Sequence, residues 1–104
     1  MIIVTTYFVT GKEVVETLGL VRGNTVRAKS AIKDFRAAIR HMIGGEITEY
    51  TAMLAESREI ALKRMEEKAE KLGADAVIGV KFMTSAIMGG AAEILAYGTA
   101  VRFR

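Results

Sequence analysis

Residues 76–84 read AVIGVKFMT and residues 92–103 read AEILAYGTAVRF, and both stretches have the composition of β-strands. In the first, the side chains alternate between Ala76, Ile78, Val80 and Phe82 on one face and Val77, Gly79, Lys81 and Met83 on the other. In the second, they alternate between Glu93, Leu95, Tyr97, Thr99, Val101 and Phe103 on one face and Ile94, Ala96, Gly98, Ala100 and Arg102 on the other. A strand with one face in water alternates apolar with polar residues, and these mostly do not. The pattern predicts a sheet that needs cover on both faces.

Two helices are expected before this pair of strands. Ser30 to Ile43 has helical spacing, with Ser30 as its N-cap, and a long helix runs from Glu46 or Thr48 to Leu72. Gly44-Gly45 separates the two helices, and Gly73 suits the left-handed residue that ends the second.

The N-terminal part of the chain is expected to be extended. Ile2 to Thr5 is a short strand, and Lys12 to Val26 is rich in β-branched residues, with a turn at Gly11 before it. We interpret Gly19 as a bulge and Gly23 as a turn. With a turn at residues 88–90, the order is ββααββ. This order predicts an α+β fold, in which a curved, mostly antiparallel sheet packs on one long and one short helix.

Because both faces of these strands are largely apolar, the sequence predicts self-association. Two helices can cover one face of the sheet, and the simplest cover for the other face is a second copy of the chain. A monomer in which small residues such as Ala96 and Gly98 face solvent is the alternative. We expect a homo-oligomer.

Composition narrows the class of protein. The chain has 104 residues, which suits a single domain over 1–104, and 51% of them are hydrophobic. It has no cysteine, which excludes disulfides and thiolate chemistry and fits a cytoplasmic location. The net charge of +3 is scattered, so no nucleic-acid partner is expected. The apolar stretch from Phe82 to Val101 contains Glu93, so no membrane span is expected, and no secretory signal is visible.

Three segments together resemble a known family. They are Ile43-Gly44-Gly45 followed by Tyr50, then LGADAVIGV at 72–80, then Tyr97-Gly98-Thr99-Ala100-Val101. Their order and spacing resemble the YbjQ-like proteins, a family that carries a heavy-metal-binding label, and Gly11, Arg58 and Ala61 also match that pattern. The resemblance implies a dodecin-like subunit and a cyclic pentamer, or a decamer of two stacked pentamers. It implies no secure biochemical activity.

Metal binding is weakly supported by the residues themselves. Soft metals prefer thiolate and thioether ligands, and this chain has no cysteine and one histidine, His41. His41 with Glu46 or Glu49 could contribute to a metal site in a ring, but the glycine break fixes no ligand geometry. No cofactor is identifiable, and a metal ion stays possible.

Two other places are candidates for ligand binding. Gly44-Gly45 precedes the long helix, where amides favour an anion, with Arg40 before and Tyr50 after it. The alternative is a plain turn between helices, which needs glycine for backbone reasons alone. Glu93 is an unusual charge on an apolar strand face. It either grips a ligand there or lies in water at the end of the strand.

We therefore expect an oligomeric module that binds a small ligand or metal. One alternative is an enzyme with an intersubunit site, using Glu93, Tyr97, Arg40 or Arg58. The other is a purely structural scaffold. No catalytic triad, P-loop or dinucleotide fingerprint is present in the sequence.

Overall fold

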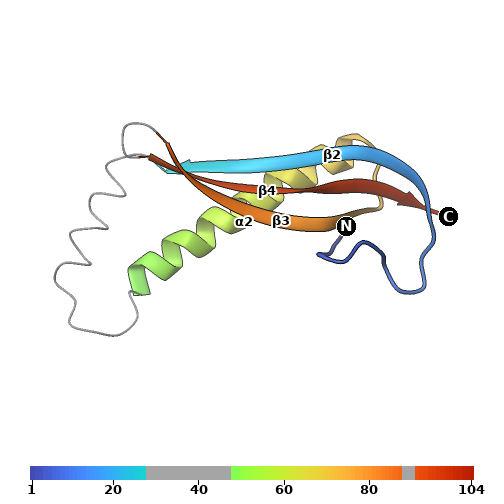
Figure 1. The fold of residues 1–104 in the computed structure, drawn as a ribbon, viewed down its shortest axis with the longest axis horizontal. Helices are drawn as coiled ribbons and strands as arrows, with labels where there is room; N and C mark the ends of the chain where they lie inside the picture. The colour runs from blue at the N-terminus through green and yellow to red at the C-terminus, as the bar shows by residue number, and fades with distance from the viewer. Residues whose placement is uncertain (28–47, 88–90) are drawn as a thin grey trace.

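A computed structural model describes residues 1–27, 48–87 and 91–104 of the chain. Its elements are β1 (Ile2–Ile3), β2 (Val14–Arg27), α2 (Thr48–Lys71), β3 (Ala76–Ile87) and β4 (Ala91–Phe103). The four strands form one mixed sheet in the order β1-β3-β4-β2, with α2 packed along it (Figure 1). β1 pairs with β3 in parallel, and the other pairs are antiparallel. The α+β class and the long helix are confirmed. The predicted helix at 30–43 and turn at 88–90 lie outside the described residues.

Helix α2 ends as its sequence predicts. The amide of Gly73 donates to the carbonyl of Glu70 at 2.9 Å, and the amide of Ala74 donates to that of Ala69 at 3.1 Å. This is the Schellman arrangement, which needs a left-handed residue, and Gly73 has a φ of 76°. Lys68 and Lys71 occupy the last turn, where the helix dipole favours positive charge.

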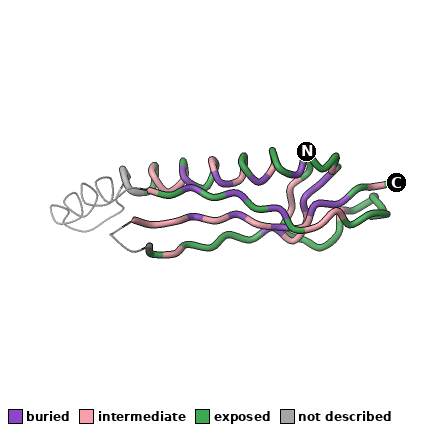
Figure 2. The backbone as a smooth tube through the Cα atoms, turned by 90° about the horizontal axis from the view of Figure 1, so that it is seen from above, coloured by how far each residue is buried: buried purple, intermediate pink, exposed green. Residues whose placement is uncertain are grey.

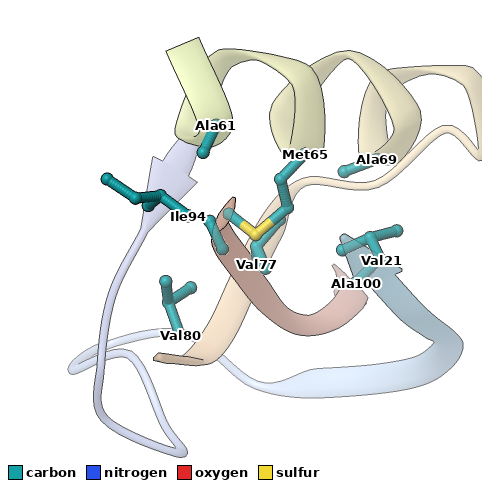
Figure 3. Close-up of a cluster of buried hydrophobic side chains, with 9 residues drawn as sticks. Val21, Ala61, Met65, Ala69, Val77, Val80, Ile94 and Ala100 are labelled. Atoms are coloured by element: carbon teal, nitrogen blue, oxygen red, sulfur yellow. The ribbon is translucent and has the colours of Figure 1, made fainter. Parts of the chain in front are cut away.

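The core lies between α2 and one face of the sheet (Figure 3). Ala61, Met65 and Ala69 form the buried stripe of the helix. They pack on buried residues from three strands, which are Val21, Val77, Val80, Ile94, Ala96 and Ala100. Because most of these side chains are small, the helix and the sheet approach each other closely.

Gly23 lies at the point of closest approach, and the prediction of a turn there is wrong. It is a buried residue within β2, paired with Ala96. A Cβ atom at this position would lie 2.3 Å from the carbonyl oxygen of Ala61 and 2.3 Å from the amide nitrogen of Met65. Glycine is therefore required here because the helix backbone occupies the space of a side chain.

The predicted faces of residues 76–84 are wrong, because β3 contains an irregularity. The pairing with β4 shifts between Ile78 and Lys81, and Gly79 has a φ of 61°. Val77 and Val80 consequently both face the core, whereas uninterrupted alternation separates them. The predicted bulge at Gly19 is confirmed, since the register of β2 shifts between Thr17 and Gly19. β1 is shorter than predicted and β3 is longer.

The two faces of the sheet differ in their cover. Helix α2 packs over β2 and β4, and the residues buried beneath it alternate with more exposed ones along both strands (Figure 2). We call the side that faces away from α2 the outer face. Within the part of the chain that the structure describes, no helix is long and apolar enough to cross a membrane.

Candidate functional site

Three rows of side chains cross the outer face from β2 through β4 to β3. The strand register aligns Arg22 with Tyr97 and Lys81, then Asn24 with Leu95 and Met83, then Val26 with Glu93 and Ser85. Neighbours within a row have Cβ atoms about 5 Å apart. We call the first of these, Arg22-Tyr97-Lys81, the tyrosine row. It brings two cations and a phenol onto one surface from three different strands.

Lys81 is held in position by a residue from the N-terminal segment. Its ammonium Nζ donates a hydrogen bond of 2.7 Å to the hydroxyl of Tyr7. The same Nζ lies 5.1 Å from the centre of the Tyr7 ring, so it sits beyond the hydroxyl end and the hydrogen bond dominates over contact with the ring face. Tyr7 can lie there because its ring packs where Gly79 lacks a side chain.

The electrostatic surroundings of Lys81 keep its charge. The hydrogen bond to Tyr7 chiefly raises the pKa of Lys81 above its ordinary value of 10.5, with smaller upward effects from the charges of Tyr7 and Tyr97. None of these neighbours is a carboxylate. The ammonium is therefore protonated at neutral pH, and no carboxylate of the described residues lies within ion-pair distance of it.

Arg22 also lacks an acidic partner. Three other arginines form ion pairs, namely Arg27 with Glu56, Arg102 with Glu16 and Arg104 with Glu13. Among the described residues, Arg22 has neither an ion pair nor a hydrogen bond through its side chain, and the Tyr97 hydroxyl likewise has no partner. Within residues 1–27, 48–87 and 91–104, the tyrosine row thus presents two positive charges with no acidic partner beside a phenol hydroxyl with no hydrogen-bond partner.

Apolar side chains surround this row on the same face. Leu20 is 66% exposed and Met83 is 51% exposed, while Leu95, on the central strand β4, is half-buried. Val26, at the end of β2, is also exposed. These side chains make the outer face apolar around its charges, and α2 does not cover them.

Glu93 and Tyr97 are the two predicted site residues that the structure places on one surface. Both lie on the outer face of β4, with Leu95 between them. Glu93 is half-buried, and its Oε2 accepts a hydrogen bond of 2.9 Å from the side-chain amide of Asn24. The structure thus gives this carboxylate an exposed hydrogen-bond partner, and ligand binding by Glu93 stays a prediction.

The other predicted site residues do not join this surface. Arg58 is an exposed residue of α2, and α2 packs on the opposite face of the sheet. Tyr50 lies in the first turn of α2. The remaining candidates, Arg40, His41, Gly44, Gly45 and Glu46, lie outside the described residues.

A shallow groove with a volume of about 550 Å³ runs along α2 beside Ile3. Its lining includes Ile60 and Leu62 together with three glutamates and Lys63. None of the described residues predicted to bind a ligand lines it. The groove is therefore separate from the outer face.

The described residues bring together no cluster of His, Cys, Asp or Glu donors that would form a heavy-metal centre. No group of three or more His, Cys, Asp or Glu residues gathers within 1–27, 48–87 and 91–104. The whole sequence also lacks cysteine, the ligand that soft metals prefer. The proposed ligands His41 and Glu46 are not among the described residues. The described part of the chain therefore offers no cluster of His, Cys, Asp or Glu ligands for a metal ion.

Three residues of the outer-face site were not among the predicted ligands: Tyr7, Arg22 and Lys81. For Arg22 and Lys81, the one signal in the sequence is a charged side chain between apolar neighbours of a strand. That signal becomes informative only when the register aligns both with Tyr97. Tyr7 gave no signal because its contact with Lys81 joins residues 74 positions apart.

Comparison with known proteins places the chain in a family. The YbjQ family model, described as "Putative heavy-metal-binding", matches residues 1–104. A UPF0145 protein of Fervidobacterium nodosum is 62% identical over 104 residues, covering 100% of this chain and 96% of the relative. One from Methanosarcina acetivorans is 59% identical over 102 residues, covering 98% and 96%. A crystal structure of a DUF74-family protein of unknown function from Pediococcus pentosaceus matches with a TM-score of 0.65 and 19% identity, covering 100% of this chain and 98% of that one. This structural likeness supports the fold.

Proposed function

Because the chain belongs to the YbjQ family of UPF0145 proteins, we propose that it works as a homo-oligomeric module that binds a small ligand on surfaces shared between copies. The observation that carries this proposal is the exposure of apolar side chains on the outer face. Leu20 and Val26 are each more than half exposed there, although both are apolar. Covering them with a second copy removes apolar surface from water, at about 25 cal/mol per Å² buried.

The edges of the sheet support a ring in particular. β2 is 14 residues long and pairs only with β4, so its other edge is open among the described residues. At the opposite side, β1 pairs with Ala76 and Val77, which leaves the edge of β3 beyond Lys81 without a neighbouring strand in the described part. Open edges of this length are sites of strand addition.

The two open edges have different sequences, which supports a head-to-tail contact in the proposed assembly. Pairing β2 of one copy with β3 of the next is a head-to-tail contact, and such contacts generate closed rings when the rotation closes. A pentamer or decamer, which the family resemblance implies, is the form that we propose. We propose the cytoplasm as its location, because a chain without cysteine needs no oxidising compartment.

A pair of substitutions tests the assembly. Leu20→Glu places a charge on the outer face, where it would be buried against a partner, so it should reduce the sedimentation coefficient toward that of a monomer. Leu72→Glu is the matched control, because Leu72 is an apolar residue, 46% exposed, at the end of α2. It should leave the assembled mass unchanged. Equal sedimentation of both variants with the wild-type protein would argue against the outer face as the interface.

A further inference from the structure

We propose that the tyrosine row binds the anionic group, a carboxylate or a phosphate, of a small ligand whose apolar body lies over Leu95 and Met83. This inference rests on the proposed function and names the ligand class for it. The row and its apolar neighbours are adjacent on the outer face, because Leu95 and Met83 form the next row along the sheet.

The charges at the row suit one small anion. Arg22 and Lys81 stand on either side of Tyr97, on strands whose backbones are about 10 Å apart. Long side chains can therefore converge over the phenol ring from both sides. The guanidinium group offers two parallel donors to a carboxylate or phosphate, while the ammonium supplies a point charge. Tyr97, on the strand between them, offers its hydroxyl as a further donor.

The position of Lys81 is prepared before any ligand arrives. Its hydrogen bond of 2.7 Å to the Tyr7 hydroxyl restrains the ammonium. A cation already restrained in this way loses less side-chain entropy on binding than a freely moving surface lysine. Because the described residues offer Arg22 and Lys81 no carboxylate within ion-pair distance, an incoming anion does not have to displace an internal partner.

Glu93 limits the size and charge of the ligand. It lies four residues from Tyr97 on the same face of β4, which corresponds to about 13 Å along an extended strand. A second negative charge on the ligand near Glu93 would be repelled. A long polyanion such as a nucleic acid is thereby disfavoured, and a single anionic head with an apolar body that ends before Glu93 is favoured.

The assembled full-length protein tests this inference by isothermal titration calorimetry with two probes of suitable length, octanoate and octyl phosphate. Octylammonium serves as the control with the opposite charge. We expect at least one anion to bind and octylammonium not to bind. The tighter of the two anions identifies whether the site takes a carboxylate or a phosphate.

Substitutions identify the site. Arg22→Gln and Lys81→Gln should each weaken binding of the anion by about tenfold or more, because each removes one charge-assisted contact. Arg58→Gln is the matched control, an exposed cation on α2, and it should bind as the wild type does. Tyr7→Phe, which keeps the charge of Lys81 but frees its ammonium, should weaken binding less than Lys81→Gln.

Sedimentation of each sample separates this inference from the assembly. An assembled protein that binds neither anion, binds octylammonium equally, or binds the anions equally well in all variants overturns the ligand assignment and leaves the assembly standing. A monomer that binds octanoate through Arg22 and Lys81 supports the ligand assignment and contradicts the assembly. A monomer without binding contradicts both.

Discussion

Gly23→Ala is the substitution to which the packing of α2 on the sheet should be most sensitive. The added methyl group would lie 2.3 Å from both the Ala61 carbonyl oxygen and the Met65 amide nitrogen, and 2.8 Å from the Arg64 carbonyl carbon. All three obstacles are backbone atoms of the helix. No side-chain rotation can relieve the overlap, so the whole helix must move away from β2.

The size of that movement sets the expected cost. An ordinary contact of 3.4 Å requires α2 to retreat by about 1 Å. A gap of this size forfeits a quarter to a half of the dispersion energy of each affected contact, and Ala61, Met65 and Ala69 all lie in the affected layer. Overpacking in a core typically costs about 1–3 kcal/mol, and rigid backbone obstacles place this case at the upper end, near 3 kcal/mol.

Urea denaturation followed by circular dichroism, at one fixed protein concentration, measures the change. Gly11→Ala is the control, because nothing lies within 4 Å of the added atom and only its φ of 78° is unfavourable. Its cost should be about 1 kcal/mol. The double variant Gly23→Ala/Met65→Ala should not regain stability, since the obstacles are backbone atoms. A Gly23→Ala protein whose stability is within about 0.5 kcal/mol of the wild type, the range of an ordinary surface substitution, would refute the close approach.

Three further substitutions test separate contacts. Thr25→Val removes the buried hydrogen bond of 3.0 Å from the Thr25 hydroxyl to the Ser57 carbonyl, and chemical denaturation should show a loss of about 1 kcal/mol. Gly73→Ala places a side chain on a residue with a φ of 76° and should cost about 1 kcal/mol in the same assay. Tyr7→Phe should lower the pKa of Lys81 toward its ordinary 10.5, as followed by NMR titration. Because the pKa of Lys81 is raised in the folded state, any stability from this contact is complete below pH 10.5 and is lost as the pH rises through the folded-state pKa. An unchanged pKa of Lys81 in the Tyr7→Phe variant would contradict the hydrogen bond as the cause of the shift.

The elements that local sequence determines were predictable. Residue composition identified the strands at residues 76–84 and 92–103, helical spacing identified the long helix, and Gly73 marked its end. Each of these depends on residues only a few positions apart. The shared face of Glu93 and Tyr97 also followed from alternation alone, because β4 runs without a shift across that stretch.

Features that depend on distant partners were not predictable. The role of Gly23 arises from a helix about 40 residues later in the chain. The shift between Ile78 and Lys81 is invisible in a run that reads as continuous strand, and it reverses which residues of β3 face the core. The tyrosine row requires the register of three strands at once, so Arg22 and Lys81 could not be linked to Tyr97 from the sequence.

The mass of the wild-type protein at micromolar concentration, determined by native mass spectrometry, tests the central claim directly. One chain has a mass of 11.3 kDa. If copies of this chain bury the outer face and the open edges of one another, the spectrum should show a single multiple of that mass, with little monomer. A spectrum dominated by 11.3 kDa species would mean that those apolar side chains face solvent, and the shared-surface function would have to be abandoned.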